Sequence, residues 1–286
     1  MKPKKSIGVA DRPLFSFETS SAEDALAMKA RFQAAQPFPH IVIDDFLTLP
    51  PADVLPSFPG PDWSGWTVFQ DRYQFNKRFC NDIDRIPSPF RDMIYRLSSP
   101  SFLSFMETIT GIKGLIPDPY LTGGGLHSSG KGGVLAPHAD FHHYHQLELF
   151  RRINILLYFN VDWRRTDGGS LELFGKANED PVERIVPAYG RMVMFLTDNK
   201  SIHGFTQPIA HPDSDRMSLA LYYYTSEETR SFSGSGDTLW REHGKASGTS
   251  FLRLVIYKGM LRAAALLSRI AHAANPNLQK KPRKAD

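Results

Sequence analysis

Between about residue 116 and residue 226, the chain consists of short apolar runs separated by turns that contain glycine, aspartate and proline. Residues 191–196, for example, form a mostly apolar run of strand length, and residues 198–201 have the composition of a turn. Many short strands at this spacing predict a β-sandwich or a β-barrel. The sequence contains no internal repeat.

The preceding region, residues 1–115, has a pattern of loops and helices. A capping-box signal at residues 20–23 predicts a helix that extends to about residue 34. Further helices are expected from Pro89 onward and over residues 102–109. We therefore interpret this region as helical and loop support for the β region.

The C-terminal part, residues 227–286, begins with a polar segment that is either a lid or a linker. Residues 250–270 are then largely apolar, with basic residues at near-helical intervals: Arg253, Lys258, Arg262 and Arg269. This pattern predicts an amphipathic helix that packs on the domain or, alternatively, contacts a membrane surface. With 286 residues, 41% of them hydrophobic, the chain fits a single elaborated domain (1–286) with 116–226 as its core.

Charge and cysteine usage narrow the class of protein. The 34 basic and 30 acidic residues give a net charge of only +4, without a basic stripe, which argues against a nucleic-acid partner. The single cysteine, Cys80, excludes an intramolecular disulfide framework and favours the cytoplasm. We expect no signal peptide, because no apolar segment follows the charged N-terminus, and no transmembrane span.

Three residues suggest a metal centre. His138 and Asp140 are two positions apart in an apolar segment, so in an extended strand both side chains point to the same side. His203 follows a later strand and is the candidate third ligand. Two imidazoles and one carboxylate on one face of an ion leave the other face open, which suits a non-haem Fe(II) that binds a co-substrate and O2. A surface pair or a buried core histidine is the alternative explanation of the first two residues.

The motifs around these residues occur in a characteristic order: His138-Ala-Asp140, Arg151-Arg-Ile-Asn154-Ile-Leu-Leu-Tyr158-Phe-Asn160, Gly168-Gly169-Ser-Leu171, Gly190-Arg-Met-Val-Met-Phe195, His203-Gly204 and Arg216-Met-Ser218. This order resembles that of the 2-oxoglutarate and Fe(II)-dependent dioxygenases, in particular the prolyl-4-hydroxylase-like branch. The resemblance covers about residues 120–226, and residues 37–46 look like a strand common in that branch. It implies a mainly β fold with flanking α: a double-stranded β-helix (a jelly-roll, cupin-like core) with N-terminal and C-terminal helices.

Carried over to this chain, the resemblance implies that His138, Asp140 and His203 bind the metal and that Arg216 pairs with the distal carboxylate of 2-oxoglutarate. A guanidinium binds a carboxylate bidentately and stays charged when desolvated. Four further positions are candidate co-substrate contacts: the hydroxyls of Tyr158 and Ser218, the apolar wall of Leu171, and Asn154, which replaces the threonine of the family pattern. Ordinary strand packing is the alternative for Tyr158, Leu171 and Ser218.

The activity that the resemblance implies is hydroxylation of an unactivated C–H bond, with Fe(II), 2-oxoglutarate and O2, and with ascorbate as a further candidate cofactor. Succinate and CO2 are the co-products. Candidate substrates are a prolyl or other peptidyl residue, an amino acid or another small metabolite. In related halogenases a small residue replaces the metal-binding carboxylate, so Asp140 favours hydroxylation. The alternative is a cupin-like metal-binding or scaffold protein without turnover.

The other histidines have weaker signals. His127 follows a glycine run and is a candidate to reach substrate, whereas His40 is expected to be structural and His211 exposed. A cluster of histidines directly after the metal motif indicates either a second metal site or, preferably, a solvated loop: His142, His143 and His145. We expect substrate selection to reside in the segments beside the metal motif: 121–133, 141–146 and 226–237.

Overall fold

The computed structural model describes residues 13–71, 73–176, 179–227 and 239–240, and nine helical positions beyond them. These nine positions are Ile256, Tyr257, Gly259, Met260, Ala263, Ala264, Leu266, Leu267 and Ile270. The chain divides into two units, residues 1–242 and 243–286, which we describe separately.

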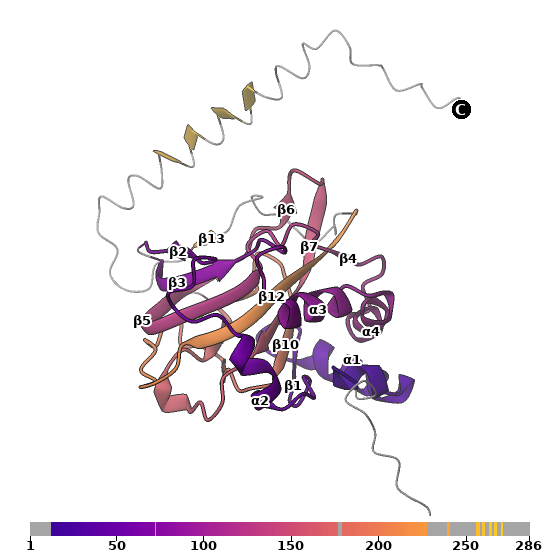
Figure 1. The fold of residues 1–286 in the computed structure, drawn as a ribbon. Coiled ribbons are helices and arrows are strands. Elements are labelled where there is room, and N and C mark those ends of the chain that lie inside the picture. The colour runs from indigo at the N-terminus through magenta and orange to yellow at the C-terminus, as the bar shows by residue number, and fades with distance from the viewer. Residues whose placement is uncertain are drawn as a thin grey trace, which may run out of the picture. The chain divides into compact units, whose positions relative to one another are not determined.

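One antiparallel sheet curls into two layers that share the long strand β5 (Gly125–Ala139). The first half of β5 pairs with β12, and its end pairs with β11. The first layer has the order β10-β7-β12-β5 and the second the order β5-β11-β8-β9, as Figure 1 shows in part. This is the double-stranded β-helix expected from the sequence. The other strands of the two layers are β7 (Leu149–Tyr158), β8 (Leu171–Phe174), β9 (Glu183–Ile185), β10 (Met192–Leu196), β11 (Ile202–Phe205) and β12 (Arg216–Thr225).

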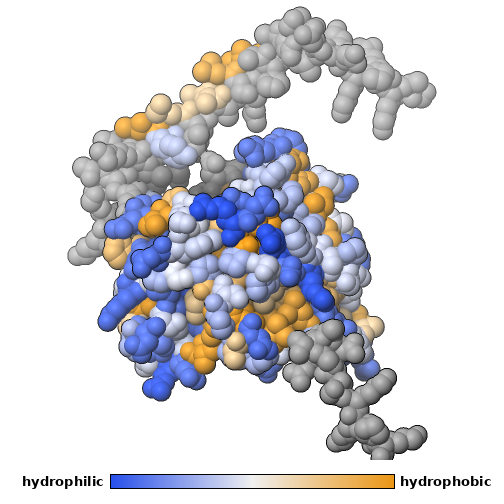
Figure 2. All heavy atoms as spheres, in the orientation of Figure 1, coloured by the Kyte–Doolittle hydropathy of each residue, from blue (hydrophilic) through white to orange (hydrophobic). Residues whose placement is uncertain are grey.

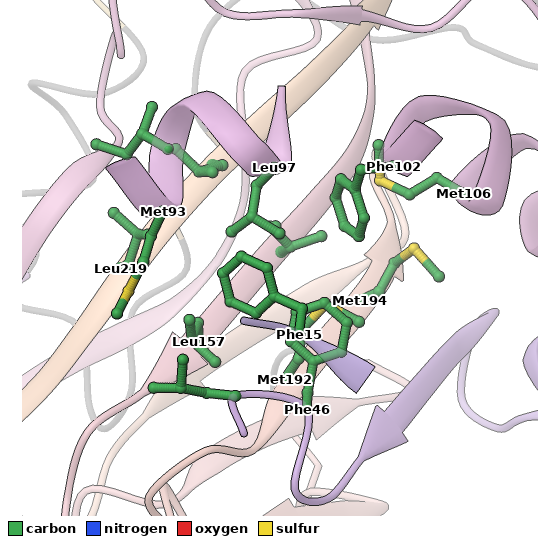
Figure 3. Close-up of a cluster of buried hydrophobic side chains, with 14 of the residues drawn as sticks. Phe15, Phe46, Met93, Leu97, Phe102, Met106, Leu157, Met192, Met194 and Leu219 are labelled. Atoms are coloured by element: carbon green, nitrogen blue, oxygen red, sulfur yellow. The ribbon is translucent and has the colours of Figure 1, made fainter. Parts of the chain in front are cut away.

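Strand periodicity separates the two faces of the first layer. On β12, Leu219 and Leu221 belong to the main hydrophobic core, whereas Ser218, Ala220 and Tyr222 face the interior of the barrel. The outer face is covered by three helices (Figure 1): α1 (Ala22–Ala34), α3 (Ser88–Leu97) and α4 (Pro100–Thr110). Figure 3 shows the resulting core, in which side chains from α3 and α4 pack on those of β7, β10 and β12. This packing fixes the strands that carry the interior side chains.

The helices follow the predicted pattern with one correction. The capping box of α1 uses Ser21 and Asp24 rather than residues 20 and 23. The Ser21 hydroxyl accepts the backbone N–H of Asp24 at 3.1 Å, and the Asp24 carboxylate accepts the N–H of Ser21 at 2.9 Å. A sequence with adjacent serines and adjacent acids satisfies either register, and only the fold selects one. The helices expected near Pro89 and over 102–109 are confirmed as α3 and α4.

The N-terminal region also contains strands that the sequence analysis did not predict. β2 (Thr67–Phe69) and β3 (Gln74–Cys80) form a hairpin, and β3 pairs with β5 along its length. β1 (His40–Ile43), expected from the resemblance, extends the first layer beside β10. The short elements are η2 (Ser16–Thr19), α2 (Pro51–Val54), η3 (Leu55–Ser57), β4 (Ile116–Pro117), β6 (His143–Tyr144), η4 (Arg165–Asp167) and β13 (Leu239–Trp240).

The second unit, residues 243–286, is described only at the nine helical positions. Their backbone is helical, as predicted for residues 250–270, and their side chains are exposed; the apolar ones appear in orange in Figure 2. The four basic residues of the predicted amphipathic helix lie outside the described residues, as does most of the polar segment 226–237. No described helix has the length and apolar character needed to cross a membrane.

Candidate metal and co-substrate site

The three predicted metal ligands converge at one end of the barrel. His138 lies near the end of β5, Asp140 directly follows that strand, and His203 on β11 is the cross-strand partner of His138. The two imidazole rings are 4.5 Å apart. His138 Nε2 lies 3.6 Å from Asp140 Oδ1, and His203 Nε2 lies 3.7 Å from Asp140 Oδ2. The three donor groups therefore surround a single point.

Backbone carbonyls orient both imidazoles. His138 Nδ1 donates to the carbonyl of Ala136 at 2.9 Å, and His203 Nδ1 donates to that of Ser201 at 3.0 Å. With the proton fixed on Nδ1, the lone pair of each Nε2 is directed to the common point, as in metal-binding histidines with a backbone partner. Burial lowers the pKa of His203 to about 4, and His138 adds to this effect, so the His203 ring is neutral at pH 7. This donor set fits a divalent transition metal.

Asp140 is held by two side chains of β7. Arg151 Nη2 lies 3.2 Å from Asp140 Oδ2, and Asn154 Nδ2 donates to the same oxygen at 3.0 Å. Burial alone would raise the pKa of Asp140, but Arg151 and then the two imidazoles hold this pKa well below its ordinary value. The Arg151 guanidinium also lies 3.3 Å from the centre of the Tyr222 ring. Asp140 is thus an oriented, ionised carboxylate.

A cavity of about 220 Å³ opens beside the three donors. Side chains from both layers and from the β2–β3 hairpin line it. The residues include His138, Asp140, His203, Asn154, Leu171, Arg216, Ser218, Lys77, Phe79, His127 and Tyr222. The cavity has room for a small dicarboxylate next to a metal ion.

Arg216, at the start of β12, is buried in this cavity. Its Nε donates to the carbonyl of Gly169 at 2.6 Å, and its Nη2 donates to the Tyr158 hydroxyl at 3.1 Å. The guanidinium also lies 4.5 Å from the centre of the Phe205 ring. Among the described residues, no carboxylate lies within 4.0 Å of it. A buried cation without an anionic partner favours an anionic ligand.

Glycines allow the strands to approach closely around Arg216 and His203. Gly168 and Gly169 have φ values of +70° and +63°, a left-handed region that favours glycine. A Cβ atom on Gly169 would lie 3.1 Å from Arg216 Cδ, and one on Gly204 would lie 2.7 Å from the Leu135 carbonyl oxygen. These contacts explain why the sequence has a glycine pair before Leu171 and a glycine after His203.

The four candidate co-substrate contacts have different places and partners in the site. Leu171 and Ser218 line the cavity, and Tyr158 touches Arg216 through its hydroxyl. Asn154 lines the cavity too, but its amide donates to Asp140, while its Oδ1 is buried without a hydrogen-bond partner. Asn154 therefore orients Asp140, a candidate metal ligand.

The structure adds residues that sequence reasoning missed. Lys77, Gln74 and Phe79 of β3 line the cavity. Nothing in the local sequence distinguishes these residues, because their role depends on pairing with strands distant in the chain. His127, which the sequence offers as a candidate to reach substrate, lines the cavity too.

The histidine cluster after the metal motif is only partly solvated. The expectation of a solvated loop is wrong for His142, which is buried next to Phe150. Its carbonyl accepts the backbone N–H of Arg151 at 2.7 Å, and this bond holds the residue against β7. His143 Nδ1 lies 3.0 Å from His145 Nδ1, whereas His143 Nε2 lies 3.5 Å from Glu148. His143, His145 and Glu148 can each place one donor atom within 4.8 Å of the others, as a metal ion would require, but His145 and Glu148 are exposed, and exposed groups commonly cluster in this way without an ion.

The two remaining histidines also have defined partners. His211 was expected to be exposed, but it is half-buried and stacks on Trp163, with the ring centres 4.8 Å apart. His40 is buried, and its ring lies within hydrogen-bond distance of the Phe38 carbonyl and of Glu183. His40 is therefore structural, as the sequence suggested.

Residues 124–224 match the family model of the 2OG-Fe(II) oxygenase superfamily, which confirms the resemblance seen in the sequence. The match includes the three candidate ligands, Arg216 and the strands that carry them. No curated protein matches the chain.

Several solved structures are similar at low sequence identity. A Pseudomonas putida prolyl-4-hydroxylase is 14% identical, covers 70% of this chain and 98% of its own, and gives a TM-score of 0.46. A Trichoplax adhaerens prolyl hydroxylase, in complex with a peptide of hypoxia inducible factor, is 17% identical over 73% and 93% of the two chains, with a TM-score of 0.49. HygX from Streptomyces hygroscopicus, with nickel and 2-oxoglutarate bound, is 13% identical over 71% and 92%, with a TM-score of 0.45.

Proposed function

We propose that this protein is an Fe(II)- and 2-oxoglutarate-dependent dioxygenase that hydroxylates an unactivated C–H bond of a small-molecule or peptidyl substrate. One arrangement carries the proposal: two imidazole Nε2 atoms and a carboxylate converge beside a buried arginine that has no carboxylate partner among the described residues. A bound iron, 2-oxoglutarate and O2 would supply the oxidising chemistry, and ascorbate remains a candidate reductant.

The protein's own residues bind and orient the reactants. His138, Asp140 and His203 would occupy one face of the ion and leave the other face to ligands. Arg216 would bind the distal carboxylate of 2-oxoglutarate with both nitrogens of its fork, assisted by the Tyr158 hydroxyl. Leu171 would exclude water on the opposite side of the co-substrate.

A cupin-like metal-binding or scaffold protein without turnover is the second candidate. Its metal site would need only the three ligands. Arg216 argues against it, because burying a guanidinium without an anionic partner is costly and a pure metal site has no use for one.

The test is anaerobic reconstitution with Fe(II) followed by titration with 2-oxoglutarate. Chelation by the 2-oxo acid should produce a metal-to-ligand charge-transfer absorption in the wild-type protein and none in the Asp140→Ala, His203→Ala double variant. Addition of O2 and candidate substrates should then yield succinate. If the wild-type protein binds Fe(II) but never develops this absorption, the scaffold alternative is correct.

We also propose that the protein acts in the cytoplasm on a small-molecule or peptidyl substrate and not on nucleic acid. The single, buried Cys80 and the near-neutral charge balance support these two assignments.

A further inference from the structure

Lys77 brings a third cation to the cavity. It lies on β3, and its side chain lines the cavity together with those of its neighbours Phe69 and Phe79. The ammonium group donates to Gln74 Oε1 at 2.9 Å, a neutral partner that orients but does not neutralise it. Among the described residues, no carboxylate oxygen lies within 4.0 Å of this group.

The cavity has an excess of positive charge. Its described lining contains three cations, Lys77, Arg151 and Arg216, but only one carboxylate, Asp140. Arg151 is already paired with Asp140 at 3.2 Å. Asp71, in the turn that joins β2 to β3, attracts Lys77 from outside the lining, but its Oδ1 accepts the backbone N–H groups of Tyr73 and Gln74.

The bound metal and co-substrate would not remove this excess. On the proposed function, the iron dication and the 2-oxoglutarate dianion neutralise each other, and Arg151 and Asp140 do the same. Arg216 and Lys77 then remain as net positive charge. Burial also lowers the pKa of Lys77 to about 8, and the attraction of Asp140 does not offset this effect. A further anion in the cavity would compensate it.

Lys77 lies apart from Arg216, so an anion bound to Lys77 would be distinct from the distal carboxylate of 2-oxoglutarate. Lys77 and Arg216 are both paired with Ser129 of β5, so they lie in one row with a strand between them. Strand spacing puts their backbones roughly 10 Å apart. Lys77 lines the same cavity as His138, Asp140 and His203, so its side chain shares that space with the candidate metal ligands.

We infer that the primary substrate carries an anionic group, a carboxylate or a phosphate, which Lys77 binds beside the metal site. This inference rests on the proposed function. Gln74 fixes the ammonium group, and Phe69 and Phe79, whose rings are 5.6 Å apart, form an apolar wall for the carbon part of the substrate. The β2–β3 hairpin is thus a substrate-binding element.

The experiment compares acids with their amides. The probes are a panel of N-acetyl amino acids, each paired with its carboxamide, and inorganic phosphate. They are titrated anaerobically into protein loaded with Fe(II) and 2-oxoglutarate, and binding is followed by calorimetry and by the charge-transfer absorption. The variants are Lys77→Met, which keeps the side-chain length, Lys77→Arg, which keeps the charge, and Lys131→Met, an exposed lysine of β5 outside the cavity.

We expect at least one N-acetyl amino acid to bind the wild-type protein at least tenfold more tightly than its carboxamide, or phosphate to bind at least tenfold more tightly than the carboxamides. Lys77→Met should abolish this preference, whereas Lys77→Arg and Lys131→Met should retain it. Affinity for 2-oxoglutarate itself should change by less than twofold in Lys77→Met. A panel in which no anion is preferred, or a preference that persists in Lys77→Met, overturns the inference.

Two outcomes separate this inference from the proposed function. If Lys77→Met weakens 2-oxoglutarate binding as much as loss of Arg216 does, Lys77 binds the co-substrate, so the inference is wrong while the function stands. If the wild-type protein binds no 2-oxoglutarate at all, the proposed function is wrong.

Discussion

Asp140 contacts both the side chains that hold it in place and the two other candidate metal ligands. Arg151 and Asn154 fix one of its oxygens, and both imidazoles face it. Groups that support a metal ligand typically change metal affinity by about 10–100-fold when they are removed. The β7 side chains should therefore influence the metal more than the co-substrate.

Asn154→Leu tests this division of roles. Removing the amide that donates to Asp140 should lower Fe(II) affinity by about 10–100-fold. At saturating Fe(II), 2-oxoglutarate affinity should stay near that of the wild-type protein. Competition with a chromophoric chelator measures the first quantity and anaerobic titration the second. Loss of 2-oxoglutarate affinity with unchanged metal affinity would assign Asn154 to the co-substrate instead.

Arg216→Met removes the proposed partner of the distal carboxylate. Truncating one member of a buried, hydrogen-bonded charge pair costs about 2–5 kcal/mol, so 2-oxoglutarate binding should weaken by that amount. Iron binding should persist, because no metal ligand is altered. Arg165→Met, in the short η4 helix outside the cavity, is the control. Unchanged affinity in Arg216→Met would mean that another cation, such as Arg151, binds the carboxylate.

At the residue scale, the sequence identified site residues through either their local spacing or the order of motifs along the chain. His138 and Asp140 were predictable because their spacing places both on one side of a strand. His203 and Arg216 were predictable only through the order of motifs around them. Lys77 has neither kind of signal, since its place in the cavity depends on which strand β3 joins.

At the element scale, the site depends on how closely β11 approaches β5. His203 and His138 are cross-strand partners, and the register shifts between His203 and Phe205. Gly204 lies at this irregularity with no room for a side chain. The distance between the two imidazoles is therefore set by the backbone of both strands.

Gly204→Ala should separate these strands. Its Cβ would lie 2.7 Å from the Leu135 carbonyl oxygen, so the backbone must shift. Overpacking of this kind costs about 1–3 kcal/mol of unfolding free energy, and the displaced His203 should also weaken metal binding. Urea unfolding of the apo-protein measures the first effect. Gly60→Ala is the matched control, because nothing lies within 4 Å of its added Cβ. Equal stability of the two variants would show that β11 adapts without strain.

Helices with a strong hydrophobic pattern were predictable from the sequence, whereas strands that depend on pairing with another strand were not. α3 and α4 have proline near their first turn and an apolar face, and both were expected. The β3 sequence Gln-Phe-Asn-Lys-Arg-Phe-Cys has only three apolar residues and is mostly half-buried. Such a strand is stabilised by its partner β5 rather than by its own composition.

At the scale of the whole molecule, metal and co-substrate should stabilise the fold by mass action. Together they would bind side chains from β5, β11 and β12, which are assembled only in the folded state. A ligand at 100 times its Kd adds about 2.7 kcal/mol to the unfolding free energy. Fe(II) and then 2-oxoglutarate should therefore each raise the anaerobic Tm, and a chelator should reverse both shifts. If 2-oxoglutarate raised the Tm equally in chelated protein, its site would be independent of the metal.

The central claim is that one Fe(II) is bound by His138, Asp140 and His203. Iron stoichiometry after anaerobic reconstitution and desalting tests it most directly, with the His138→Ala, His203→Ala double variant beside the wild-type protein. We predict one iron per chain in the wild-type protein and essentially none in the variant, with the far-ultraviolet circular dichroism unchanged. A stoichiometry that stays near one in a folded double variant would contradict the account.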